Sequence, residues 1–230
     1  MMIKAVCFDM FSTLVDPHVE MVSLEYEHTG LTREEWGKAF WDKEISDKRG
    51  LGVYKTGEEI MEAVVKRLPI ELTEDQIEKS MAGIRTRLKT ALTVIDEEIL
   101  NTVKEVKDMG LKIGLVSNAD VFDTENWPVS PLAPSFDDVI FSCDVGLAKP
   151  DRRIYELSLK NLGGIKPEEA VFVGDGGGNE HFGAKSLGFT TILTEYIYRR
   201  PPELRAEIIK NADYRVIRFK EVANIVRSLM

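Results

Sequence analysis

The sequence predicts an α/β protein in which a doubly wound, mainly parallel sheet carries an all-helical domain inserted after the first strand. The chain opens on a short apolar run, Ile3–Phe8, which ends in Asp9 and is typical of a buried strand. From residue 96 onward, similar runs alternate with helical patterns of about 10–15 residues, the order expected of a parallel sheet. Between these parts the periodicity is helical, with almost no strand signal. We therefore expect an α/β core from residues 1–15 and 94–230 and a helical domain from residues 16–93.

The composition is that of an ordinary globular protein and excludes several classes of function. With 230 residues, 43% of them hydrophobic and 30% charged, the chain can bury a core and is too apolar for general disorder. Its net charge of −9 argues against a nucleic-acid surface, which needs a basic face. No apolar run approaches the ~20 residues of a membrane span, and no signal-peptide pattern opens the chain. Cys7 and Cys143 are typical of reduced core thiols, so we expect a soluble, cytoplasmic protein.

The inserted segment is expected to form four helices. Thr32 and Thr73 each precede acidic residues, the pattern of a helix N-cap followed by an acidic first turn. Apolar residues between Ile60 and Leu68 recur at helical spacing and mark the buried face of a further helix. The four expected helices are His18–Thr29, Thr32–Asp47, Gly57–Arg67 and Thr73–Lys89.

The rest of the chain is expected to alternate between helices and strands. The expected strands are Leu111–Val116, Asp138–Phe141, Ala170–Val173, Thr190–Leu193 and Asp213–Val216. The expected helices are Glu97–Met109, Arg152–Leu162, Asn179–Leu187, one between the last two strands, and Phe219–Leu229. The stretch 120–137 contains three prolines and is expected to be a loop near the carboxyl edge of the sheet.

Polar residues follow four of the expected strands. They are Asp9 after the first, Ser117 and Asn118 after the second, Lys149 in the loop after the third, and Asp175 and Glu180 after the fourth. The carboxyl ends of parallel strands share one edge, where open α/β sheets bind ligands. A carboxylate held there can act as a nucleophile or a metal ligand. Each residue alone is explained by a turn, a surface charge or a tight connection, but together and in order they indicate one crevice.

This constellation resembles the haloacid dehalogenase superfamily of hydrolases. Its four motifs are an aspartate after strand one, a Ser/Thr after strand two, a lysine, and an acidic Gly-Asp motif. Here they read Phe8-Asp9-Met10-Phe11-Ser12-Thr13-Leu14, Val116-Ser117-Asn118, Ala148-Lys149-Pro150-Asp151, and Val173-Gly174-Asp175 with Glu180. The resemblance covers Ile3 to about Leu193 in the core, whereas the helical insertion matches only in position and kind. It implies a Rossmann-like core and a cap domain that closes over the site and selects the substrate.

The resemblance also implies a reaction and a set of roles. Asp9 would attack phosphorus to form an aspartyl-phosphate that water hydrolyses, with Lys149 and Ser117 as further catalytic residues. The substrate would be a small phosphorylated metabolite, with neither a nucleic-acid nor a membrane partner. The implied phosphoryl-binding groups are the Lys149 ammonium, the Ser117 hydroxyl and the Asn118 backbone amide. The implied Mg²⁺ ligands are Asp9, the backbone carbonyl of Phe11, Asp175 and, directly or through water, Glu180.

Phe11 departs from the family's phosphatases, which carry a second aspartate there to protonate the leaving oxygen. Phenylalanine cannot transfer a proton, and general acid help is worth about 10²–10⁴ in rate. An aromatic residue here resembles the haloacid dehalogenases proper, which carry tyrosine, attack carbon and need no metal. Against that alternative, Asp175 and Glu180 resemble a metal pair, and Trp41-Asp42-Lys43 lacks the arginine that would hold a substrate carboxylate. A non-catalytic relative that binds a ligand with its cap is a third alternative.

Other conspicuous residues are assigned structural roles. The glycines from Gly174 to Gly178 lack the spacing of a dinucleotide-binding motif. His181 is expected on a helix surface, and Arg199-Arg200 in a solvated loop. The aromatic residues Trp36, Phe40 and Trp41 are expected to pack in the core of the helical domain rather than to line a pocket.

Overall fold

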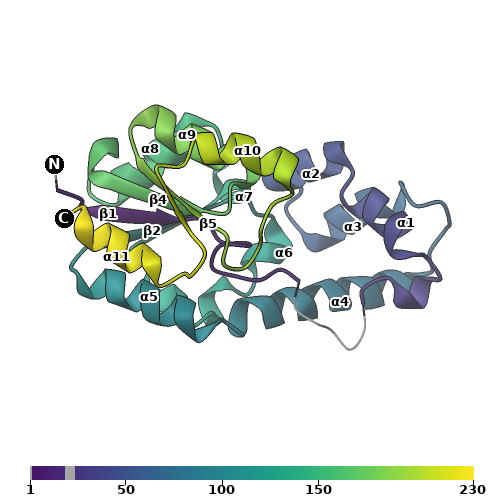
Figure 1. Ribbon diagram of the computed structural model, residues 1–230. Coiled ribbons are helices and arrows are strands. Elements are labelled where there is room, and N and C mark those ends of the chain that lie inside the picture. Colours follow the sequence, from purple (N-terminus) through teal and green to yellow (C-terminus); the bar gives the residue numbers. More distant parts are fainter. Residues whose placement is uncertain (1, 19–23) are drawn as a thin grey trace.

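The computed structural model describes residues 2–18 and 24–230, and over these residues six parallel strands form one sheet (Figure 1). The strands are β1 (Ala5–Phe8), β2 (Lys112–Ser117), β3 (Asp138–Phe141), β4 (Ala170–Gly174), β5 (Thr190–Thr194) and β6 (Tyr214–Val216). Their order across the sheet is β3-β2-β1-β4-β5-β6, and every neighbouring pair is parallel. The chain therefore winds to one side from β1 to β3 and to the other from β4 to β6. The crevice of such a doubly wound sheet lies where the winding reverses, between β1 and β4.

Helices cover both faces of the sheet, and successive residues of β1 contribute to both hydrophobic layers. Val6 and Phe8 belong to a cluster that includes residues of α5 (Glu97–Asp108) and α11 (Glu221–Ser228). Ala5 and Cys7 belong to a second cluster with α8 (Arg152–Asn161) and α9 (Glu180–Leu187). A central strand that is buried on both faces has no polar side, which explains the continuous apolar run at the start of the sequence.

Strand β1 begins two residues later than predicted, the other strands agree with the predictions within one residue at either end, and the four core helices with predicted bounds agree within two residues. The predicted loop 120–137 holds short helical turns: α6 (Val121–Thr124) and the 3-10 helices η2 (Trp127–Val129) and η3 (Ala133–Ser135). The remaining core elements are α7 (Ser142–Val145), η4 (Pro167–Glu169), η5 (Gly177–Asn179) and α10 (Pro202–Lys210).

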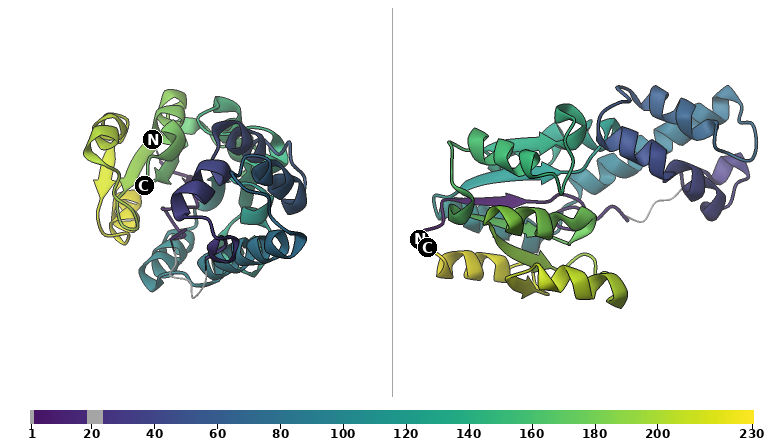
Figure 2. Two further views of the ribbon diagram at one scale, coloured as in Figure 1. Left: turned by 90° about the vertical axis from the view of Figure 1, so that its right-hand side faces the viewer. Right: turned by 90° about the horizontal axis from the view of Figure 1, so that it is seen from above.

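The inserted segment forms helices that share a third hydrophobic cluster, which also includes Phe122 of α6 from the core. It contains η1 (Glu27–Thr29), α1 (Arg33–Phe40), α2 (Lys43–Gly50), α3 (Gly57–Val65) and α4 (Glu74–Thr93). Figure 1 shows these helices beyond the carboxyl ends of the strands, and Figure 2 shows both chain ends at the opposite side of the sheet. The inserted helices therefore face the edge where the predicted site residues end their strands.

Two predicted helices of the inserted segment differ from the structure. The helix Thr32–Asp47 is two helices, because the Asp42 carboxylate accepts hydrogen bonds from the backbone N–H groups of Glu44 and Ile45 and so caps a new helix. Of the helix His18–Thr29, residues 19–23 lie outside the described part, and residues 24–29 contain only the 3-10 turn η1. That turn ends at Gly30 in the left-handed conformation, which stops a helix.

Gly52 allows a close contact between the inserted helices and the core. Its φ is +64°, and a Cβ atom there would lie 1.9 Å from the carbonyl oxygen of Cys143. We expect Gly52→Ala to lower the free energy of unfolding by about 2–4 kcal/mol, because backbone strain of about 1 kcal/mol adds to a steric clash. Gly110→Ala is the matched control: φ is +81° but no atom lies within 4 Å, so only the strain remains. Urea unfolding measures both losses, and equal losses would contradict the close contact.

Candidate active site

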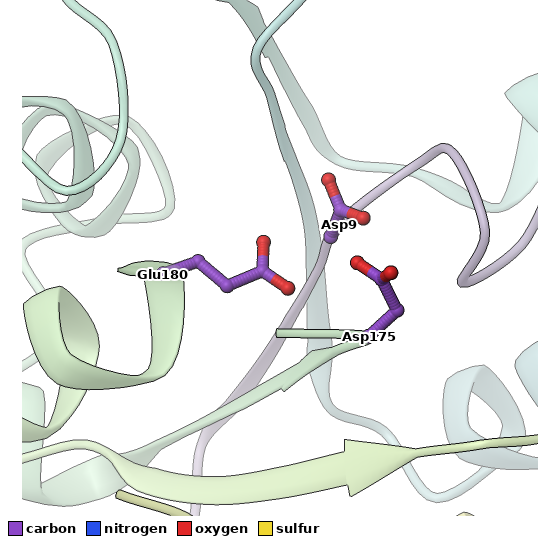
Figure 3. A group of neighbouring side chains, drawn as sticks. All are labelled: Asp9, Asp175 and Glu180. Atoms are coloured by element: carbon purple, nitrogen blue, oxygen red, sulfur yellow. The ribbon is translucent and has the colours of Figure 1, made fainter. Parts of the chain in front are cut away.

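The structure brings three of the predicted carboxylates together. Asp9 follows β1, Asp175 follows the neighbouring strand β4, and Glu180 begins α9. One oxygen from each side chain lies within 4.8 Å of the other two, and all three residues are buried. Figure 3 shows their carboxylates pointing toward one another at the carboxyl edge of the sheet. The cluster lies at the switch point of the sheet, where the sequence places the crevice.

The Lys149 ammonium joins two of these carboxylates. Its Nζ donates to Oδ1 of Asp9 at 2.5 Å and to Oε2 of Glu180 at 2.6 Å, and only 3% of its side chain is exposed. The Asn118 side chain holds the backbone of Lys149 from both sides. Its Oδ1 accepts from the Lys149 N–H at 2.7 Å, and its Nδ2 donates to the Lys149 carbonyl at 3.0 Å. The end of β2 therefore fixes where the lysine enters the site.

The proton affinities of the cluster reflect burial and like charge. Burial, and then the charge of Asp9, raise the pKa of Glu180 to about 8, although Lys149 opposes this. The same two causes raise the pKa of Asp175, with Arg200 opposing. Burial alone would lower the pKa of Lys149, but the charges of Asp9 and Glu180 outweigh it and raise the pKa. The repulsion among the acidic groups is therefore relieved by nearby cations or by binding a proton.

Thr13 orients the Asp9 carboxylate and was not identified from the sequence. Its hydroxyl donates to Oδ2 of Asp9 at 3.0 Å, on the side opposite the Lys149 contact at Oδ1. The Asp9 N–H also donates to the carbonyl of Val173 on β4. Both carboxylate oxygens are therefore held, which fixes the direction of the proposed nucleophile. In the sequence, this contact could be inferred only from the position of Thr13 four residues after the aspartate that ends the strand.

Ser117 lies at the end of β2 and Phe11 in the loop after β1, as the sequence predicts. Their contacts in the structure do not test the roles proposed for them. Ser117 ends β2, beside β1, and its buried hydroxyl has no hydrogen-bond partner within the described residues. A buried hydroxyl without a partner is costly, and a ligand atom would satisfy it. Phe11 lies two residues after Asp9, and its ring packs against both the core and the inserted helices. Its carbonyl stays a predicted metal ligand.

The glycine-rich loop after β4 gives the Glu180 carboxylate its place. A Cβ atom on Gly174 would lie 2.1 Å from Oε1 of Glu180, so the carboxylate rests where a side chain would otherwise be. The N–H of Gly176 donates to the same oxygen at 2.8 Å. The glycines therefore seat an acidic side chain instead of a cofactor phosphate, in agreement with the absence of dinucleotide spacing.

Two expectations about neighbouring residues are wrong. His181 was expected on a helix surface but is buried, and burial lowers its pKa to about 4, so the ring is neutral at physiological pH. Arg200 was expected in solvent, but its Nη2 donates to Oδ2 of Asp175 at 2.5 Å and only 29% of its side chain is exposed. The helical periodicity of the sequence did not show that His181 is buried. The composition of the loop did not show that the Arg200 side chain reaches Asp175.

The aromatic residues of the inserted segment divide into two groups. Trp36 and Phe40 are buried and stacked, as expected for core packing. Trp41 is 64% exposed, which corrects its assignment to the core. It lies at the break between α1 and α2, where the chain turns instead of continuing the buried face of a helix.

A buried ion pair links the inserted helices to the core and was missed in the sequence. Arg49 on α2 contacts Oδ2 of Asp120 through both Nε, at 2.6 Å, and Nη2, at 2.5 Å. Its Nη1 donates to the carbonyl of Phe40, and its guanidinium lies over the Phe40 ring. Asp120 also caps α6 through its other oxygen, so one carboxylate orders the loop after β2 and holds α2.

The donor set fits a hard divalent cation such as Mg²⁺. Such ions prefer oxygen ligands, and the three carboxylates offer one oxygen each within 4.8 Å, with no softer ligand among them. Formally, the three acids exceed the charges of Lys149 and Arg200 by one. Asp9, Asp175 and Glu180 are therefore able to hold the ion that the resemblance implies.

Comparison with known proteins assigns the family. A family profile described as haloacid dehalogenase-like hydrolase matches residues 3–187. A glyceraldehyde 3-phosphate phosphatase from Methanocaldococcus jannaschii is 30% identical over an alignment of 241 positions, which covers 99% of each chain. An (S)-2-haloacid dehalogenase from Pseudomonas putida is 26% identical over 179 residues, 74% of this chain and 75% of that protein. The structure of a HAD phosphatase from Thermococcus onnurineus matches with a TM-score of 0.65 at 23% identity, covering 97% of this chain and 98% of that one.

The chain belongs to the haloacid dehalogenase-like hydrolases and is an enzyme of that family. Its six-stranded parallel sheet with helices on both faces is the Rossmann-like fold that the resemblance implied. Within the described residues, no helix is both long and apolar enough to cross a membrane.

The junction between α2 and α6 makes stability depend on pH. Burial, and then the charge of Asp120, raise the pKa of Asp123 to about 7. Between about pH 4 and pH 7 the folded protein keeps this proton and the unfolded chain releases it, so stability falls as pH rises through that window. We expect Asp123→Asn to gain about 1 kcal/mol of unfolding free energy at pH 7 and little at pH 4.

Chemical denaturation at the two pH values measures this gain. Asp108→Asn is the control, because Asp108 is exposed and forms an ion pair with Lys104. Its removal should not change how stability depends on pH between pH 4 and pH 7. The same change of stability at pH 4 and pH 7 in Asp123→Asn would contradict the assignment.

Proposed function

We propose that this hydrolase cleaves the phosphate ester of a small metabolite, with Asp9 as nucleophile and Mg²⁺ as cofactor. One observation supports this most strongly: the Asp9 carboxylate is held between Lys149 and Thr13, beside Asp175, at the ligand-binding edge of the sheet. A turn or capping aspartate would need neither a buried ammonium nor a second carboxylate next to it. A nucleophile that must approach an anionic phosphoryl group needs both orientation and nearby positive charge.

In the proposed reaction an Asp9 oxygen attacks phosphorus and the bond from phosphorus to the leaving oxygen breaks. This forms an aspartyl-phosphate and releases the leaving group, whose oxygen takes up a proton from solvent. Water then attacks the same phosphorus, and the bond from phosphorus to Asp9 breaks to give inorganic phosphate and the free carboxylate. The Lys149 ammonium, the Ser117 hydroxyl and the Asn118 backbone amide would bind the phosphoryl oxygens.

The proposed metal ligands are Asp9, the carbonyl of Phe11 and Asp175, with Glu180 acting directly or through water. When bound, Mg²⁺ would offset the charge of the carboxylates and of the phosphoryl oxygens. Both oxygens of Glu180 already have partners, Lys149 Nζ at 2.6 Å and the Gly176 N–H at 2.8 Å. Both oxygens of Asp9 and of Asp175 also have partners, so the direct and the water-mediated role of Glu180 both stay open, and its contact with the ammonium positions Lys149 in either case.

We further propose that residues 16–93 act as a cap over a core of residues 1–15 and 94–230. The hydrophobic cluster that the inserted helices share and their place beyond the strand ends support this division (Figure 1). A cap in that position would exclude water from the site and contact the part of the substrate that does not react. The long helix α4 would carry the chain back to the core.

A triose phosphate is the first substrate to test. The support is the glyceraldehyde 3-phosphate phosphatase from Methanocaldococcus jannaschii, which matches this chain from end to end, cap included. Because the cap selects the substrate in the proposed mechanism, similarity through residues 16–93 bears on the choice more directly than similarity in the core.

Dehalogenation of a 2-haloacid is the second candidate, and Phe11 favours it. Asp9 would then attack carbon, the bond from carbon to halogen would break with both electrons leaving on halide, and water would hydrolyse the resulting ester. Halide needs no proton, so the missing acid would not matter. The ion pair of Asp175 with Arg200 also balances one carboxylate without a metal. The similarity to the (S)-2-haloacid dehalogenase from Pseudomonas putida supports this candidate.

Metal dependence separates the two reactions. We expect hydrolysis of glyceraldehyde 3-phosphate and p-nitrophenyl phosphate with Mg²⁺, loss of at least about 10³-fold activity with EDTA, and a similar loss in Asp9→Asn. Phosphate release and halide release from 2-chloropropionate are the measurements. Asp16→Asn, an exposed aspartate in the same loop, should keep full activity.

Phosphatase activity that is unchanged by EDTA would contradict the metal. Metal-free halide release would establish dehalogenation instead. If both assays are blank while Asp9→Asn still binds glyceraldehyde 3-phosphate, both proposed reactions are wrong and the site binds this ligand without converting it.

Phe11→Asp tests the missing proton donor. We expect its rate on glyceraldehyde 3-phosphate, whose alkoxide leaves poorly, to rise by about tenfold, because an aspartate two residues after the nucleophile can donate a proton. The rate on p-nitrophenyl phosphate should change little, since nitrophenolate leaves without help. Phe11→Leu is the control for lost packing, because the ring contacts both hydrophobic clusters. No gain on the poor leaving group would show that the proton comes from another residue.

A further inference from the structure

Arg200 reaches the proposed metal site from a loop that none of the family motifs includes. The loop runs from Glu195, after β5, to Pro201, before α10. The guanidinium Nη2 lies 2.5 Å from Oδ2 of Asp175, while Oδ1 of that carboxylate accepts the Gly177 N–H at 3.1 Å. Both oxygens of a proposed metal ligand are thus engaged by the protein itself.

The Arg200 guanidinium also contacts Gly177 and Tyr198. It lies over the backbone of Gly177, where a Cβ atom would come within 2.7 Å of Nη2. It also lies over the ring of Tyr198 in the same loop, with Cζ 5.3 Å from the ring centroid. A glycine beneath and an aromatic ring beside it make room for a planar cation.

We propose that Arg200 is a built-in counter-cation that competes with the metal for Asp175. This rests on the proposed function, which places Mg²⁺ on that carboxylate. An arginine cannot relieve the conflict by losing its proton. A divalent ion beside Asp175 would repel the guanidinium within a few ångström, so metal binding includes the cost of weakening this ion pair.

Of the two cations in the cluster, Arg200 is the one able to give way. Only 3% of the Lys149 side chain is exposed, and its backbone is clamped by Asn118. Arg200 is 29% exposed and sits on a loop whose first residue, Glu195, is anchored by Arg205 and Arg215. Tyr196 holds the chain a second time, because its hydroxyl donates to Asp96 and it packs on the core together with Ile197. Residues 198–201 are therefore left to move as the guanidinium leaves Asp175.

Metal titration measures this competition. We expect calorimetry with Mg²⁺, and with Mn²⁺ as a second probe, to show about three- to tenfold tighter binding by Arg200→Gln than by the wild-type protein. Arg200→Lys keeps the charge and should bind metal within about twofold of wild type. Arg199→Gln is the matched control, since Arg199 is 62% exposed and lies 3.8 Å from Glu195 at the far side of the loop.

Hydrogen exchange provides a readout independent of affinity and activity. In the wild-type protein, amides 198–200 should exchange faster when Mg²⁺ is added, because the loop loses its contact with Asp175. In Arg200→Gln they should exchange fast with or without the metal. Thermal unfolding of each variant confirms that it is folded before titration.

The outcomes separate this inference from the proposed function. If wild type binds Mg²⁺ and Arg200→Gln binds it equally or more weakly, the competition is refuted while the metal site stands. If only Arg200→Gln binds, the competition is confirmed in its strongest form. If neither binds any metal, the proposed metal dependence fails and the competition fails with it, leaving Arg200 as a permanent partner of Asp175.

Discussion

The site depends on one buried ammonium group shared by two carboxylates. Lys149 lies 140 residues from Asp9 and 31 from Glu180 in sequence, yet its Nζ contacts both within 2.6 Å. Without it, two buried acids beside Asp175 would lose much of the positive charge that makes their burial tolerable. Three other residues position the groups in this contact. Asn118 holds the lysine backbone by hydrogen bonds, Gly174 leaves room for the Glu180 carboxylate, and the Thr13 hydroxyl orients the Asp9 carboxylate.

The parallel sheet is what makes this contact available. The order β3-β2-β1-β4-β5-β6 places β1 next to β4, although the inserted helices, β2 and β3 all lie between them in the chain. Asp9 and Asp175 therefore leave adjacent strands at the same edge, at the point where the winding of the sheet reverses. The inserted helices leave the register of the sheet intact, because they begin after the first of these strand ends and return through α4.

Most of the fold was predictable because its pattern is local. Buried parallel strands are continuous apolar runs, and the helices between them keep one apolar face, so bounds agree within one or two residues. Asp9, Lys149, Asp175 and Glu180 were predictable because strand ends share an edge. Arg200, Arg49 and Thr13 were not, because their partners are set by where a flexible side chain ends in space. The same holds for His181, whose burial needs two packing layers, and for Asp42, whose cap competes with helix continuation.

Both cysteines are sequestered, and this has a practical consequence. Cys7 is fully buried in β1, Cys143 is 6% exposed, and burial raises the pKa of each thiol to about 12. Neither sulfur offers a thiolate to an alkylating reagent at neutral pH. A single cysteine introduced on the solvent face of an inserted helix would then be the one position that a maleimide dye modifies, so movement of those helices over the sheet becomes visible by fluorescence without first deleting a native thiol.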